Sequence, residues 1–197
     1  MSAPVRIGIL GGTFDPPHAG HVALAVAAQA TLRLDRLHVV PVAQAPLREG
    51  SPTAPASERL LLARIAFDPF PWAVVDDREI RRGGLSWSIE TAREIADENP
   101  GAELYWILGA DQLSRLHRWR EPEELCLLVR LAVLAREGEP GEPDSSLAGV
   151  ARVTRLRAPE VAVSSTDLRR RLAAGVDPGN ALPSGVAAAI QARGLYR

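Results

Sequence analysis

The stretch from Gly11 to His21 holds the residues whose types and spacing are best suited to chemistry. It reads GGTFDPPHAGH and lies between an apolar run, Val5 to Leu10, and an alanine-rich run that begins at Val22. The first run predicts a buried strand and the second a helix, so the glycines occupy a strand-to-helix turn. Glycine lets a bulky ligand approach the main chain, and a helix start offers unpaired N–H groups and a positive dipole end. The turn therefore predicts a phosphate-binding site.

His18 and His21 would add side-chain donors to this site. They are three residues apart at the start of the predicted helix, so both can point at one group. Zinc ligation is an alternative for such a pair, but neighbouring residues do not complete a tetrahedral set and Cys126 is the only cysteine. Helix capping alone is a second alternative. Cys126 lies in an apolar run and is expected to be a buried core thiol.

The complete string resembles the HxGH signature of the nucleotidylyltransferase superfamily. Its GGTFDP lead-in is similar to the nicotinate mononucleotide adenylyltransferase branch. The resemblance implies that the chain transfers the adenylyl group of ATP to nicotinate mononucleotide, giving deamido-NAD and pyrophosphate. It also implies that Mg²⁺ takes part, held mainly by the ATP phosphates rather than by a protein metal site.

A second motif, SSTDLRRR, runs from Ser164 to Arg171. Ser164 and Asp167 have the spacing of a capping box, and Gly175 follows as a natural helix end, so the motif predicts another helix N-terminus. An ordinary capped surface helix is the alternative. The motif resembles the SSTxxR of the same superfamily, which implies that its serines, its threonine and Arg169 hold the triphosphate.

The middle of the chain offers residues for both substrates. WILGAD ends a predicted buried strand at Asp111, whose carboxylate suits a ribose hydroxyl; helix capping is the alternative. The resemblance places Asp111 beside the ATP nucleoside and implies that the pyridine ring stacks on Trp119, which could equally be a core residue. The SWS sequence from Ser86 to Ser88 stands where the family has SYT, at the pyridine carboxylate. The family's PPHK is replaced by APLR, so Arg48 is expected to hold the mononucleotide phosphate.

Two other functions stay open beside adenylyl transfer to nicotinate mononucleotide. One is phosphopantetheine adenylyltransferase, and the other is a non-catalytic nucleotide-sensing module on the same fold. The resemblance assigns residues to three roles. The catalytic residues are His18, His21 and Arg169; ATP binding involves these and Gly11, Gly12, Thr13, Phe14, Asp111, Ser164, Ser165 and Thr166; the mononucleotide-binding residues are Asp15, Arg48, Ser86, Trp87, Ser88 and Trp119.

These residues must be positioned by an α/β fold. Apolar strand candidates alternate with helical runs, which predicts a Rossmann-like open parallel sheet with helices on both faces and ligands at the carboxyl ends of the strands. The expected strands are Val5–Leu10, Leu37–Val42, Trp72–Val75, Glu103–Leu108, Leu128–Leu134 and Val150–Leu156. The expected helices are His18–Thr31, Ser57–Phe67, Ser88–Glu98, Ala110–Leu116, Glu121–Leu127, Ser165–Ala174 and Gly185–Arg193.

Composition narrows the class of protein further. The chain has 197 residues, of which 46% are hydrophobic, and these values suit one nucleotidylyltransferase domain over residues 1–197 with the SSTxxR helix and a last helix at its end. A net charge of -1 gives no overall basic field for nucleic acid or an anionic membrane. Neither a membrane-spanning run nor a signal peptide is evident, so a cytoplasmic enzyme is expected. Self-association into a homo-oligomer is left open.

Overall fold

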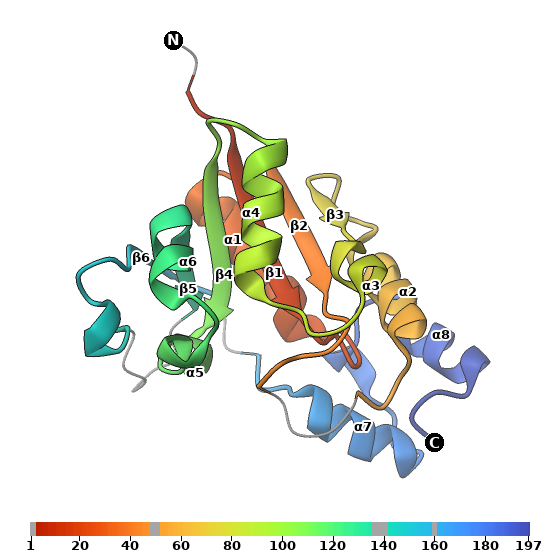
Figure 1. Ribbon diagram of the computed structural model, residues 1–197. Helices are drawn as coiled ribbons and strands as arrows, with labels where there is room; N and C mark the ends of the chain where they lie inside the picture. The colour runs from red at the N-terminus through yellow and green to blue at the C-terminus, as the bar shows by residue number, and fades with distance from the viewer. Residues whose placement is uncertain (1–2, 48–51, 135–141, 159–160) are drawn as a thin grey trace.

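A six-stranded parallel sheet forms the centre of the structure, a computed structural model that describes residues 3–47, 52–134, 142–158 and 161–197 (Figure 1). The strand order is β3-β2-β1-β4-β5-β6, so the predicted Rossmann-like fold class is confirmed. The direction of winding reverses between β1 and β4, which opens a crevice at the carboxyl ends of these strands. The strands are β1 (Arg6–Gly12), β2 (Arg36–Pro41), β3 (Ala73–Val75), β4 (Glu103–Gly109), β5 (Arg130–Leu134) and β6 (Val153–Leu156).

Helices cover both faces of the sheet, and each face has its own apolar cluster. Residues of α1, α2, α7 and α8 pack on one face, whereas residues of α4, α5 and α6 pack on the other. Cys126 belongs to the second cluster and is 2% exposed, which confirms its expected place in the core. The helices are α1 (Ala19–Leu32), α2 (Ala56–Phe67), α3 (Arg78–Arg82), α4 (Ser88–Glu98), α5 (Ala110–Leu113), α6 (Pro122–Leu128), α7 (Ser165–Ala173) and α8 (Val186–Arg193), with 3₁₀ turns η1 (Leu116–Arg118), η2 (Ser145–Leu147) and η3 (Gly179–Ala181).

β1 passes between the two apolar clusters. Ile7 and Ile9 face one cluster and Leu10 the other, as expected for a strand buried on both sides. Gly8 lies at a close approach, because a Cβ there would be 2.6 Å from Leu34 and 2.8 Å from Leu37. β1 is a central strand, so the glycine turn at its end lies near the middle of the carboxyl-terminal side of the sheet.

Two helical segments differ from expectation. The helix expected over Ala110–Leu116 stops at Leu113, where the Ser114 hydroxyl donates to the Asp111 carbonyl at 3.0 Å and the chain continues as η1. The short helix α3 was not predicted. Arg78 anchors it through a local bond to Asp76 and a bond to Glu98, and the second is a tertiary contact that a local pattern does not reveal.

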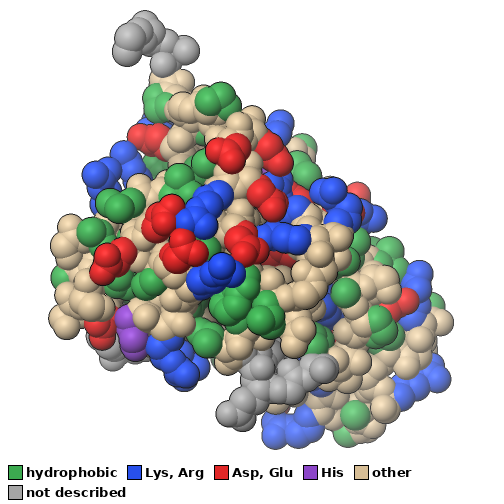
Figure 2. Space-filling view, in the orientation of Figure 1, with side chains coloured by type: hydrophobic (Ala, Val, Ile, Leu, Met, Phe, Trp, Pro, Cys, Tyr) green, Lys and Arg blue, Asp and Glu red, His purple; other side chains and the backbone are tan. Residues whose placement is uncertain are grey.

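Charged side chains of both signs are interspersed over the face that carries α4 (Figure 2). Ion pairs join α3 to α4 through Arg82 and Glu90, and α4 to α6 through Arg93 and Glu124. Exposed pairs of this kind contribute about 0–1 kcal/mol each. This face therefore has no strong field of one sign. No helix in the described ranges is long and apolar enough to cross a membrane.

Candidate active site

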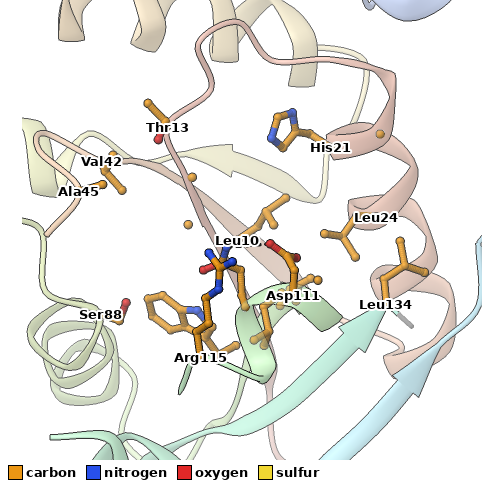
Figure 3. Close-up of a pocket in the computed structure, with 18 of the residues that line it drawn as sticks. Leu10, Thr13, His21, Leu24, Val42, Ala45, Ser88, Asp111, Arg115 and Leu134 are labelled. Atoms are coloured by element: carbon orange, nitrogen blue, oxygen red, sulfur yellow. Dashed lines mark hydrogen bonds between the residues drawn. The ribbon is translucent and has the colours of Figure 1, made fainter. Parts of the chain in front are cut away.

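A cavity of about 860 Å³ opens at the carboxyl ends of β1 and β4, where the fold predicts a ligand. Its wall brings together segments from most of the chain, and Figure 3 shows His21, Ser88, Asp111 and Arg115 around it. The described part of the loop after β2 also borders it, through Val42 and residues 45–47. The predicted site residues that line this cavity are Gly11, Gly12, Thr13, His18, His21, Ser86, Trp87, Ser88, Asp111, Trp119, Ser164 and Ser165.

The two histidines form one unit at the start of α1. His18 is the N-cap residue, and its ring lies on that of His21 with centroids 3.8 Å apart. The backbone N–H of His18 donates to Nδ1 of His21 at 3.1 Å. Nδ1 of His21 therefore carries no proton, and the neutral ring holds its proton on Nε2.

Burial decides the charge of both rings. It lowers the pKa of His18 to about 4, and it lowers the pKa of His21 well below its usual 6.5, with repulsion from His18 as a second cause. Both side chains are therefore neutral at pH 7 before a ligand binds. They can act as hydrogen-bond donors, but they bring no positive charge to the empty cavity.

This arrangement predicts the titration of the ligand-free protein. Neither ring should gain a proton between pH 8 and pH 5.5, and His18 should protonate only near its lowered pKa of about 4. Long-range ¹H–¹⁵N correlation spectra measure both the pKa and the tautomer, and His21 should show the Nε2–H form. The same residues in urea-unfolded protein serve as the control and should titrate near 6.5. Ordinary titration of both rings in folded protein would contradict the assignment.

Phe14 supports the histidine pair from the core. Its side chain is 1% exposed and packs against His21 with ring centroids 4.9 Å apart. A Cβ at Gly12 would lie 3.1 Å from the Phe14 ring, so glycine allows these two residues to pack closely. The Phe14 side chain does not line the cavity, and its expected contact with ATP stays a prediction. Its apolar ring is buried where it holds His21 in position.

Asp15 also lies away from the cavity wall. Its carboxylate is fully buried and accepts hydrogen bonds from the Thr53 and Ala54 N–H groups at 2.8 and 3.0 Å. The Tyr196 hydroxyl donates to it at 2.9 Å, and burial together with the Asp15 charge raises the pKa of Tyr196. Asp15 therefore joins the glycine turn to two distant segments, and its expected contact with the mononucleotide stays a prediction.

Helix α7 docks onto the same turn. Ser164 caps it by accepting from the Asp167 N–H at 3.1 Å, as its capping-box spacing predicts, and Ser165 donates to the Pro16 carbonyl at 3.0 Å. Arg169 donates to the Asp15 carbonyl at 2.8 Å and to the Thr166 hydroxyl at 3.2 Å. Neither Thr166 nor Arg169 lines the cavity, so their predicted contact with the triphosphate stays a prediction. Their observed bonds hold the helix start against the turn.

Arg59 is an important residue that the motifs do not reveal. It is 1% exposed on α2 and donates to the carbonyls of Thr13 at 2.7 Å, Ala43 at 3.2 Å and Ala54 at 3.2 Å. These bonds tie the glycine turn to both ends of the loop after β2. Helical spacing in the sequence could have indicated that Arg59 is buried, because it lies on the same face of α2 as Leu62 and Ala63.

The opposite wall of the cavity carries the SWS sequence at the start of α4. Ser86 accepts from the Ala43 N–H at 2.9 Å, which holds this turn against the loop after β2. Trp119 is half-buried and meets Trp106 edge to face at 6.1 Å, leaving part of its ring to the cavity. Glu79, which was not predicted, also lines this wall; burial raises its pKa although Thr91 donates to it at 2.5 Å.

Asp111 stands in the first turn of α5 without capping that helix, whose N-cap residue is Gly109. Its carboxylate is exposed to the cavity and accepts from Gln112 at 2.9 Å. A Cβ at residue 109 would lie 2.7 Å from the Asp111 carboxylate, so glycine leaves room for this orientation. Arg48 lies outside the described residues. Among those described, no group of three or more His, Cys, Asp and Glu side chains could hold a metal ion.

Known proteins resemble this chain over nearly its full length. Residues 9–171 match the cytidylyltransferase-like family. A protein of Roseiflexus sp. (strain RS-1), named probable nicotinate-nucleotide adenylyltransferase, is 42% identical over 201 residues, covering 100% of this chain and 99% of the relative. One of the same name from Opitutus terrae is 39% identical, covering 98% of each chain. The structure of Plasmodium falciparum nicotinic acid mononucleotide adenylyltransferase complexed with APC has a TM-score of 0.78 at 18% identity, covering 98% of this chain and 97% of that one, and supports the fold.

Proposed function

The chain belongs to the cytidylyltransferase-like family, and we propose that it is a nicotinate-nucleotide adenylyltransferase. It transfers the adenylyl group of ATP to nicotinate mononucleotide. The observation that carries this proposal is the His18–His21 pair at the start of α1, set in a cavity with the α7 start on one side and the SWS turn on the other. The histidine pair and the α7 start supply hydrogen-bond donors for phosphate, and the SWS turn supplies donors for a second substrate.

The reaction needs positioning and charge stabilisation rather than a covalent intermediate. A phosphate oxygen of the mononucleotide attacks the α-phosphorus of ATP, the bond from that phosphorus to the bridging oxygen breaks, and pyrophosphate leaves with the electron pair. The nucleophile is already ionised at pH 7, so no general base is required. When bound with ATP, Mg²⁺ would be held mainly by the ATP phosphates and would neutralise part of their charge.

The residues of the cavity take defined parts in this reaction. His18 donates to the α-phosphoryl oxygens, and the Nε2–H of His21 donates to the neighbouring phosphates. Ser164 and Ser165 present hydroxyl and N–H groups to the triphosphate, and Asp111 accepts from the ribose of ATP. Arg169 is the proposed cation for the leaving pyrophosphate, for which its side chain must leave the Asp15 carbonyl.

A pyrophosphate-release assay with ATP and several acceptors tests this function. Nicotinate mononucleotide should be the best acceptor, and phosphopantetheine should give no release above background. Release with phosphopantetheine alone would establish the other adenylyltransferase activity. ATP binding without release for any acceptor would establish a nucleotide sensor.

We expect the enzyme to prefer nicotinate mononucleotide to its amide by about 10-fold to 100-fold in kcat/KM. Ser88 and the free N–H groups at the start of α4 donate to a carboxylate, whereas a carboxamide turns its own N–H₂ group toward these donors.

Steady-state kinetics with ATP in excess measure this preference. Ser88→Ala should reduce the ratio by weakening the use of the acid, and Ser145→Ala, in the exposed turn η2 outside the cavity lining, should leave the ratio unchanged. Equal values for acid and amide in the wild type would overturn the expectation.

A further inference from the structure

If the proposed function holds, the cavity needs positive charge to balance the phosphates of two substrates. Both substrates bring phosphate groups, each carrying about -1.5 to -2 charges when terminal. His18 and His21 are neutral because they are buried, and Asp111 adds a negative charge. Beyond the charge that Mg²⁺ would neutralise on ATP, positive charge from the protein must come from arginine, since the chain has 23 basic residues and no lysine.

Among the described residues, three arginines line the cavity: Arg115, Arg118 and Arg120. The Arg120 guanidinium is already engaged, by Glu90 at 3.1 Å and Glu121 at 3.4 Å, and it lies over the Trp87 ring. Within the described ranges, no hydrogen bond or ion pair occupies the guanidinium of Arg115 or Arg118. These two side chains are therefore available to a ligand.

Arg115 is the better placed of the two. It lies between α5 and η1, one helical turn after Asp111, at the point where the Ser114 bond ends the helix. Figure 3 shows its side chain extending into the cavity between Ser88, on the mononucleotide side, and Asp111, on the ATP side. A side chain at this position lies where the mononucleotide and ATP would come together.

We propose that Arg115 binds the phosphate of the mononucleotide substrate. The phosphates of ATP have donors at the starts of α1 and α7, whereas the SWS wall offers serine hydroxyls and the already paired Arg120. Arg48, which the sequence assigns to the mononucleotide phosphate, lies outside the described residues, and Arg115 would act beside it. The planar guanidinium can donate two parallel hydrogen bonds to a phosphate, which fixes the attacking oxygen as well as its charge. Arg115 thus orients the nucleophile and sets the requirement for a phosphorylated acceptor.

The test separates the phosphate from the rest of the ligand. Dissociation constants of nicotinate mononucleotide and of its riboside, which lacks the phosphate, are measured by tryptophan fluorescence for the wild type, Arg115→Ala and Arg115→Lys. Arg36→Ala is the matched control, because Arg36 is exposed at the amino end of β2, at the opposite end of the sheet. Weak riboside binding is read as an inhibition constant in the pyrophosphate-release assay.

Arg115→Ala should weaken binding of the mononucleotide about 10-fold to 100-fold and change that of the riboside less than about 2-fold. Arg115→Lys should recover part of the loss, and Arg36→Ala should match the wild type. Equal weakening of mononucleotide and riboside would overturn the proposal, as would unchanged binding of both. A loss confined to ATP would assign Arg115 to the triphosphate instead. Failure of the wild type to use nicotinate mononucleotide would refute the proposed function, which distinguishes it from failure of this inference.

Discussion

His18→Ala should lower turnover by about 10²-fold to 10³-fold while changing the affinity for ATP far less. The loss of one preorganised donor to charge that develops in the transition state has this magnitude in other enzymes. His18 fits the role of a preorganised donor because it lies at the start of α1 and stacks on His21. Burial has already removed most of its solvent and keeps the ring neutral, so donation to the phosphate requires no further desolvation. Saturating kinetics give turnover, and titration with ATP alone gives its dissociation constant.

The fold should tolerate this change, because Nδ1 of His18 is buried without a hydrogen-bond partner in the described structure. His117→Ala is the matched control, since that histidine is exposed and lies outside the cavity lining. Near-normal turnover of His18→Ala would refute its role as a transition-state donor. A large loss of ATP affinity with unchanged turnover would make His18 a ground-state binding residue.

Arg59→Leu should reduce the free energy of unfolding by about 3–5 kcal/mol. The leucine fills much of the space but leaves the carbonyls of Thr13, Ala43 and Ala54 without the donor that joins them. An unsatisfied buried polar group costs about 1–3 kcal/mol. The variant should also lose activity, because the Thr13 carbonyl belongs to the turn that places the histidines.

Urea unfolding measures this change, and Arg64→Leu is its control on the same helix. The Arg64 side chain is 56% exposed and pairs with Asp77 at 3.6 Å, so its loss should cost no more than about 1 kcal/mol. Similar costs for the two variants would show that the Arg59 hydrogen bonds contribute little to stability.

Local patterns in the sequence were sufficient for the six strands and most of the helices, though not for α3, and they indicated the ligand-binding edge of the sheet. The apolar run before Gly11 and the alanine-rich run after His21 are β1 and α1, and the predicted cap at Ser164 starts α7. Such patterns succeed because a strand, a helix or a cap depends on neighbours within a few positions. The order of polar motifs along the chain likewise indicated which of them end strands.

Only the tertiary structure decided which residues face the ligand and which hold the site together. Asp15 and Phe14 lie inside the most informative motif, yet both point into the protein, whereas Arg59 and Arg115 belong to no motif. Asp15 meets Tyr196, which is 181 positions away in the chain. Contacts between residues so far apart in the chain depend on how the helices and strands pack in space, and the spacing of residues along the sequence does not predict this packing. The composition showed that any cationic role falls to arginine or histidine, but only burial and pairing identified the arginines left free to bind phosphate.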